Sequence, residues 1–135
     1  MGKFLRQYEI LFKKAVVDLN SAKVIWISFE QGNIELDMEV IFFHLQQCSE
    51  KFIKSLLDFY QIKFPRTHDL QSLINLLETH NIELDGVEKL LPLSVYAVEG
   101  RYAILHDDLD DVDRYIEIVD ELLEIVRIQI NEIEN

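Results

Sequence analysis

The sequence is poor in cysteine, proline and glycine, and it has no long apolar run free of charge. Its 135 residues include one cysteine, two prolines and four glycines. Cys48 alone cannot form an intrachain disulfide or a cysteine-built zinc site, so a cytoplasmic protein is expected. No apolar stretch approaches the roughly 20 residues of a membrane span, and charged residues interrupt the N-terminal region where a signal peptide would need an apolar core. We therefore expect no membrane association.

Basic residues are also scarce relative to acidic ones. The 13 lysines and arginines face 25 aspartates and glutamates, which gives a net charge of −12 and excludes a broad basic surface for nucleic acid. Much of this charge lies in residues 101–135, which hold 11 acidic and three basic residues. The hydrophobic fraction of 49% is far too high for a disordered acidic tail. A chain of this length is expected to fold as a single domain spanning residues 1–135.

Apolar residues recur at steps of three and four along most of the chain, which is the pattern of amphipathic helices. No segment alternates apolar and polar residues between hairpin turns. The first two long helices are joined by a short connection, so they should pack antiparallel. The sequence therefore predicts an all-α, up-and-down bundle of four to five helices. The expected helices cover about residues 4–30, 38–59, 68–80, 87–98 and 109–135.

Several residues mark the expected ends and interruptions of these helices. Asp37 is the predicted cap of the second helix, and Thr67 that of the third. Pro92 should kink the fourth helix, because proline lacks the N–H that an α-helix needs. The last helix is expected to begin at Asp107 or Asp108, with further aspartates favourably placed at the positive end of its dipole.

Common catalytic and metal-binding motifs are missing. The sequence has no glycine-rich phosphate loop, no HExxH and no Gly-x-Ser-x-Gly. The four histidines have no metal-ligand spacing. We therefore expect no metal site and no cofactor.

The second predicted helix carries a polar string with three charged residues, Glu50, Lys51 and Lys54. Glu50 and Lys54 form an i,i+4 pair, and its simplest interpretation is a solvated helix face worth about 0.3 kcal/mol. His68 is interpreted as a polar first-turn residue of the third helix, beside Asp69, which complements the helix dipole.

Arg101 and His106 lie in a loop-like stretch before the last helix, with four residues between them. On a continuous helix they would point about 140° apart, but a break at Gly100 would allow both to face one side. An arginine that stabilises a phosphate and a histidine that transfers protons suffice for metal-free RNA cleavage, because the RNA supplies the 2′-hydroxyl nucleophile. Alternatively, Arg101 pairs with Glu99 or with an aspartate of 107–113, and His106 is a polar residue of the capping region.

Four segments in fixed order resemble the HEPN family of small helical proteins, especially the stand-alone kind encoded beside minimal nucleotidyltransferases. The resemblance implies a helical bundle that dimerises with a groove between protomers. The matching segments are Asp18-Leu19 with Ala22, Gln47-x-x-Glu50-Lys51-x-x-Lys54-x-Leu56-Leu57, Phe64-Pro65-x-Thr67-His68-Asp69-Leu70, and Leu93-Ser94-x-Tyr96-Ala97-Val98-Glu99-x-Arg101-Tyr102.

Many members of this family are metal-independent endoribonucleases whose arginine and histidine converge from two chains at the dimer cleft. The resemblance thus implies that Arg101 and His106 are catalytic, in a toxin-like protein silenced by a nucleotidyltransferase partner. The alternative is a non-catalytic subunit in which Lys51, Lys54, Arg101 and Tyr102 contact nucleotide phosphates or that partner.

A third hypothesis is a helical interaction module without a ligand. A homodimer is also expected from the first helix, whose apolar residues extend beyond one face. These additional apolar residues are Phe4, Leu5, Val16, Val17, Ile25 and Ile27.

Overall fold

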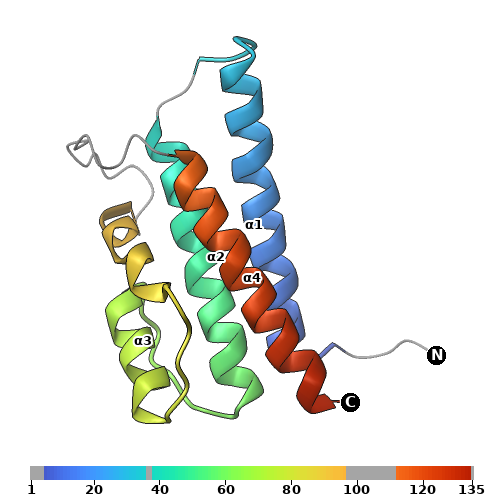
Figure 1. Ribbon diagram of the computed structural model, residues 1–135, viewed down its shortest axis with the longest axis vertical. Helices are drawn as coiled ribbons and strands as arrows, with labels where there is room; N and C mark the ends of the chain where they lie inside the picture. Colours follow the sequence, from blue (N-terminus) through green and yellow to red (C-terminus); the bar gives the residue numbers. More distant parts are fainter. Residues whose placement is uncertain (1–4, 36–37, 97–111, 135) are drawn as a thin grey trace.

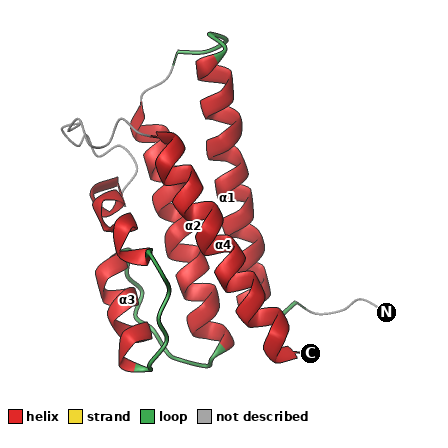
Figure 2. Cartoon of the chain, in the orientation of Figure 1, coloured by secondary structure: helices red, strands yellow, loops and turns green. Residues whose placement is uncertain are grey.

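The computed structural model consists of helices joined by loops (Figures 1 and 2). It describes residues 5–35, 38–96 and 112–134, the last of these with side chains up to Asn131. No strand occurs within these ranges, and none of their helices has the length and apolar character to cross a bilayer. The prediction of an all-α bundle is therefore confirmed. Its elements are α1 (Gln7–Glu30), α2 (Met38–Phe59), α3 (Leu70–Thr79), the 3-10 helix η1 (Val87–Tyr96) and α4 (Val112–Glu134).

Helix α2 forms the centre of the bundle, because its buried residues face four other elements. It packs against α1, α4, η1 and α3 (Figure 1). The short connection after α1 lets α1 and α2 run antiparallel, as expected from its length. Buried residues on the other elements converge on α2, so one apolar core joins them all. The buried apolar residues of α2 itself are Ile41, Phe42, Leu45, Cys48, Phe52, Ile53, Leu56 and Leu57.

The N-cap of α3 is Asp69, so the prediction of Thr67 as its cap is wrong. The Asp69 side chain accepts a hydrogen bond from the backbone N–H of Gln71, at 3.2 Å, and α3 begins at Leu70. Thr67 instead accepts a hydrogen bond from the backbone N–H of Asp69, at 3.0 Å. Thr67 therefore stabilises the turn that leads into the cap. The other predicted caps, at positions 37, 107 and 108, lie outside the described residues.

The segment around Pro92 is a 3-10 helix rather than the predicted kinked α-helix. Proline removes one N–H and its ring excludes the carbonyl four residues earlier, which favours the tighter helix. A 3-10 helix has three residues per turn, so side chains three apart lie on one face. The buried residues of η1 follow that spacing and are Val87, Leu90, Leu93 and Tyr96.

Three helices end in the same way, with a residue in the left-handed region followed by a backbone bond to the last turn. After α2 this residue is Gln61, with φ of 60°, and the N–H of Ile62 donates to the carbonyl of Leu57 at 2.9 Å. Gly32 after α1 and Asn81 after α3 occupy equivalent positions. These Schellman-type ends turn the chain sharply. At the end of α2 the turn starts the linker of residues 60–69, which leads to α3.

Candidate functional site

The buried carboxylate of Glu50 is the centre of a polar network inside the bundle. Glu50 is only 3% exposed. Its oxygens accept hydrogen bonds from Lys54 Nζ at 2.7 Å, from His68 Nδ1 at 2.9 Å and from Gln46 Nε2 at 3.3 Å. Gln46 Nε2 also donates to the backbone carbonyl of His68, at 3.1 Å. The network therefore fastens the end of the 60–69 linker to α2.

Two interpretations made from the sequence are wrong at this network. The Glu50 and Lys54 pair does not lie on a solvated helix face, because the linker covers this side of α2. His68 is not in the first turn of α3, which begins at Leu70. Its ring donates to Glu50 instead, which places the Nδ1 proton between the two side chains.

A second ion pair joins α1 to α2. Lys51 Nζ donates to Asp18 Oδ2, and His44 Nδ1 lies 3.8 Å from Asp18 Oδ1. Burial alone would raise the pKa of Asp18, but the His44 and Lys51 side chains outweigh this effect and hold that pKa below its ordinary value. Burial also raises the pKa of the nearby Cys48 thiol, which makes this thiol a poor nucleophile.

The two lysines predicted to contact phosphates thus bind carboxylates within the chain. Lys51 is directed to Asp18 on α1, and Lys54 is directed to Glu50 on its own helix. Lys54 Nζ also lies 5.9 Å from the centre of the Phe64 ring. The Lys51 ammonium group therefore joins two helices, whereas the Lys54 ammonium group stays within one helix. A phosphate bound by either lysine would have to compete with a carboxylate.

Arg101, Tyr102 and His106 lie outside the described residues. The structure does describe the elements on either side of them. The Tyr96 ring at the end of η1 stacks on Phe42, with centroids 5.2 Å apart, and the Tyr115 ring of α4 packs edge-on against the same phenylalanine at 5.8 Å. The chain therefore leaves η1 and enters α4 beside one aromatic ring on the first turns of α2.

The first turn of α4 also forms a hydrogen bond to α1. Trp26 Nε1 donates to Asp113 Oδ1 at 3.0 Å, and two turns further along α4 Lys23 Nζ donates to Asp120 Oδ1 at 2.7 Å. Asp113 is the one aspartate of the predicted acidic cap region that falls within the described residues. Its partner is an indole N–H, so the start of α4 is held against α1 as well as against Phe42.

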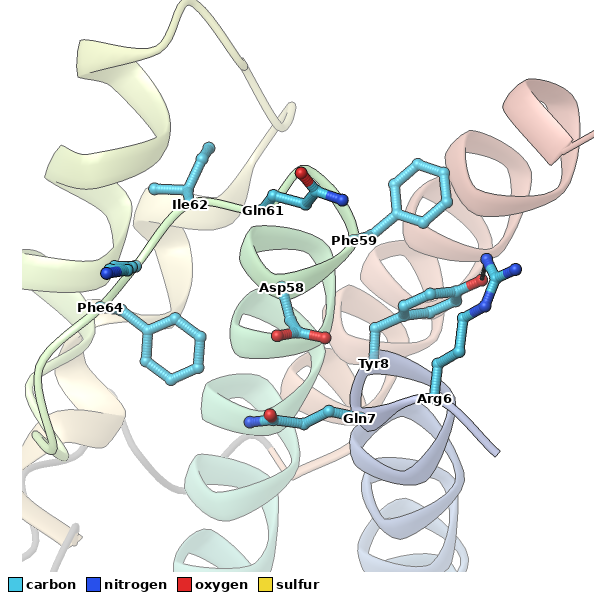
Figure 3. A pocket seen from close by; sticks show the side chains of 9 residues that line it. Arg6, Gln7, Tyr8, Asp58, Phe59, Gln61, Ile62 and Phe64 are labelled. Carbon is cyan, nitrogen blue, oxygen red and sulfur yellow. Dashed lines mark hydrogen bonds between the residues drawn. The ribbon is translucent and has the colours of Figure 1, made fainter. Parts of the chain in front are cut away.

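An open cavity of about 950 Å³ lies at the other end of α2 (Figure 3). Aromatic rings and both kinds of charge line it, and Asp58 projects between Gln7 and Phe64 (Figure 3). Arg6 donates to the Tyr8 hydroxyl at its edge, at 3.2 Å. No sequence motif marks this cavity. Its lining residues are Arg6, Gln7, Tyr8, Asp58, Phe59, Gln61, Ile62, Lys63 and Phe64.

The part of the chain that the structure describes contains no candidate metal site. No group of three or more histidine, cysteine, aspartate or glutamate side chains there could hold a metal ion. The residues that sequence inspection missed are Gln46 and His68 as ligands of Glu50. No local signal marked them, because an i,i+4 pair on a helix is ordinarily solvated and His68 lies 18 residues from Glu50 in the sequence.

Two comparisons with known proteins point to the same family. A family model described as the HEPN domain matches residues 8–129. The crystal structure of an archaeal HEPN homologue is similar over 93% of this chain and 99% of that chain, with 26% sequence identity and a TM-score of 0.63. The comparison with curated proteins found no significant match. The family match includes the positions of Arg101 and His106 as well as most of the helices described above.

Proposed function

Because the chain belongs to the HEPN family, we propose that it is a metal-independent endoribonuclease in which Arg101 and His106 act on RNA. The protein acts as a dimer in this proposal. It is the toxin-like component of a two-gene module, and its partner is a minimal nucleotidyltransferase.

The observation that carries the proposal is that the family match over residues 8–129 includes Arg101 and His106. They belong to a segment that starts after Tyr96 and ends before Tyr115, and both tyrosines contact the Phe42 ring. The proposal requires that the Arg101 and His106 side chains face one side, which a continuous helix would forbid.

The chemistry assigns one role to each residue. The Arg101 guanidinium binds the phosphate oxygens and stabilises the negative charge of the transition state. A neutral His106 takes the proton of the 2′-hydroxyl, whose oxygen forms a bond to phosphorus while the bond from phosphorus to the 5′-oxygen breaks. The protonated His106 of the second copy gives its proton to the leaving 5′-oxygen. The products are a 2′,3′-cyclic phosphate and a free 5′-hydroxyl.

The test uses the purified full chain and single-stranded RNA or tRNA, with EDTA present. We expect cleavage that leaves cyclic phosphate ends and that falls at least about 100-fold in His106→Ala and in Arg101→Ala. His80→Ala and Arg66→Ala are matched controls because both residues are exposed, outside the proposed site, and they should leave the rate unchanged. Intact RNA with the wild-type chain, or equal cleavage by His106→Ala, would overturn the proposal.

The partner needs a separate experiment. The nucleotidyltransferase encoded beside this chain should co-purify with it and relieve the growth defect that expression of the chain alone causes in bacteria. Equal growth with and without the chain would contradict a toxin-like role, and so would the absence of such a neighbouring gene.

The non-catalytic nucleotide-binding subunit is the weaker alternative. It relies in part on Lys51 and Lys54, whose ammonium groups already bind Asp18 and Glu50. Calorimetry with each nucleoside triphosphate distinguishes the endoribonuclease from the nucleotide-binding subunit. Micromolar binding of a nucleoside triphosphate, together with uncut RNA, would favour the nucleotide-binding subunit. Tight binding should then weaken in Tyr102→Ala, which keeps both ion pairs.

A further inference from the structure

The open cavity at the C-terminal end of α2 combines a carboxylate, aromatic rings and two cations (Figure 3). Three parts of the chain form it, namely the start of α1, the last turn of α2 and the linker of residues 60–69. Its volume of about 950 Å³ is large enough for a small organic ligand. Asp58 in this cavity lies about 24 Å along α2 from Phe42, at about 1.5 Å per residue. A small ligand bound here is therefore remote from Phe42 and from the two tyrosines that contact it.

Asp58 occupies a position at which a carboxylate disfavours the helix. It lies in the last turn of α2, where the unpaired carbonyls form the negative end of the helix dipole and no basic residue compensates them. Among the described residues, no side chain forms a hydrogen bond or an ion pair with the Asp58 carboxylate. Figure 3 shows this side chain projecting between Gln7 and Phe64. The fold gains nothing from this charge, which makes the carboxylate a candidate contact for a ligand.

The rest of the lining suits a planar ligand that carries a negative charge. Lys54 Nζ lies over one face of the Phe64 ring, at 5.9 Å, so a planar group can stack only on the other face. Lys63 is exposed on the linker, and its ammonium group has no ion pair within the described residues. Arg6 already donates to the Tyr8 hydroxyl, at 3.2 Å. Stacking on a ring together with a lysine for the phosphate is how proteins bind nucleotides.

The Asp58 carboxylate selects among the nucleobases. A carboxylate has two acceptor oxygens and no donor, so it pairs best with two neighbouring N–H groups. Guanine offers such a pair, N1–H and N2–H, on one edge. Adenine and cytosine place an acceptor beside their amino group, and uracil places its single N–H between two carbonyls. An arginine side chain offers the same two donors as guanine, but Arg6 and Lys63 would repel its positive charge.

We propose that this cavity binds the guanine base of a nucleotide. Asp58 accepts hydrogen bonds from N1–H and N2–H, the Phe64 ring stacks on the base, and Lys63 binds the phosphate. The turn at Gln61 and the hydrogen bonds of the Glu50 network hold the two ends of the linker segment that carries Lys63 and Phe64. This wall of the site is therefore formed before the ligand binds. The site uses none of the residues assigned above to RNA cleavage or to the nucleotide-binding alternative.

Calorimetry of the full chain with guanosine monophosphate (GMP) and adenosine monophosphate (AMP) tests the role of Asp58. We expect GMP to bind about 10- to 100-fold more tightly than AMP, because only guanine offers both donors. Asp58→Asn should abolish this preference without lowering the stability of the fold, since it removes an unfavourable charge from the end of α2. Asp85→Asn, at an exposed loop position, is the matched control and should keep the preference.

Three results would overturn the proposal. They are equal binding of GMP and AMP by the wild type, an unchanged preference in Asp58→Asn, and binding of argininamide where GMP does not bind.

Two further variants separate stacking from phosphate binding. Phe64→Leu should weaken GMP and AMP by the same factor, about 10-fold, because every base has a face that stacks. Lys63→Gln should weaken GMP but leave the binding of guanosine, which lacks the phosphate, unchanged. Lys89→Gln, at an exposed position on η1, is the control and should bind GMP as the wild type does. An equal loss of GMP and guanosine binding in Lys63→Gln would contradict the phosphate contact.

The guanosine phosphate can be a free nucleotide or one residue of an RNA strand. A 2′-O-methyl RNA hexamer with one guanosine among uridines distinguishes the two sources. It lacks the 2′-hydroxyl that cleavage needs, so its binding does not depend on nuclease activity. Binding of the hexamer at least as tight as that of GMP assigns the cavity to RNA, whereas binding of GMP alone assigns it to the free nucleotide. The preference for guanine and the cleavage of RNA can therefore fail separately.

Discussion

Glu50 is a charged residue held in the interior of the bundle by three donors from two parts of the chain. Two of them, Gln46 and Lys54, lie one turn away on either side along α2, and the third, His68, comes from the linker. A buried carboxylate is tolerated only when its oxygens are paired in this way. The same arrangement makes each partner dependent on Glu50, because Lys54 would otherwise keep a partly buried charge without a counter-ion.

Replacement of Glu50 should therefore be costly. We expect Glu50→Ala to lower the free energy of unfolding by about 3 kcal/mol, since it leaves Lys54 uncompensated and releases the linker. Glu78→Ala, at an exposed position on α3, should change it by less than about 0.5 kcal/mol. Urea titrations followed by circular dichroism give both values. A similar small change for the two variants would show that the network contributes little.

The sequence contained the residues of this network but not its geometry. An i,i+4 pair such as Glu50 and Lys54 is ordinarily solvated, and nothing local distinguishes this one. Burial arises because residues 60–69 return along α2, and that depends on a sharp turn at Gln61 and on the docking of α3. The spacing of apolar residues along one helix does not show which distant segment will pack against it.

At the scale of elements, the pair of Asp18 and Lys51 joins α1 and α2, the two helices with the largest mutual contact in the bundle. The pKa of Asp18 lies below its ordinary value of 3.8. A carboxylate with a lowered pKa stabilises the folded state above its unfolded pKa, and this contribution is lost as the pH falls through the folded pKa. The α1 and α2 contact should therefore weaken in acid.

A pH series on Asp18→Asn measures this contribution. Above about pH 5 the variant should be less stable than the wild type by roughly 1 kcal/mol, and the difference should shrink as the pH falls below about 4. Asp85→Asn, at an exposed loop position, serves as the control and should show no such trend. A constant difference between pH 3 and 7 would mean that the Asp18 charge is not what stabilises the contact.

The spacing of apolar residues predicted that each of the five helical elements exists, but it did not predict all of their ends or the helix type of η1. The long stripes of α1, α2 and α4 gave their approximate extents. The end of the first predicted helix at Glu30 is confirmed, whereas the third begins later because Asp69, not Thr67, accepts the first-turn N–H. The spacing of three in η1 was present in the sequence, but a proline inside an apolar run suggested a kink rather than a tighter helix.

For the whole molecule, one core runs through all five elements. We therefore expect a single cooperative transition, with the near- and far-ultraviolet circular dichroism signals of the purified chain coinciding along a urea titration. This result would support the prediction of one domain over residues 1–135. An early loss of the near-ultraviolet signal would instead indicate that the tertiary packing of the aromatic side chains is lost before the helices unfold.

The central place of α2 also bears on how the chain folds. Its largest contact is with α1, its neighbour in sequence, and the connection between them is short. Closing a short loop costs little entropy, whereas α4 reaches α2 only after about 50 intervening residues are ordered or looped out. The hairpin of α1 and α2 is therefore the natural nucleus. Truncation of Leu45 should slow folding, and truncation of Val126 should mainly speed unfolding.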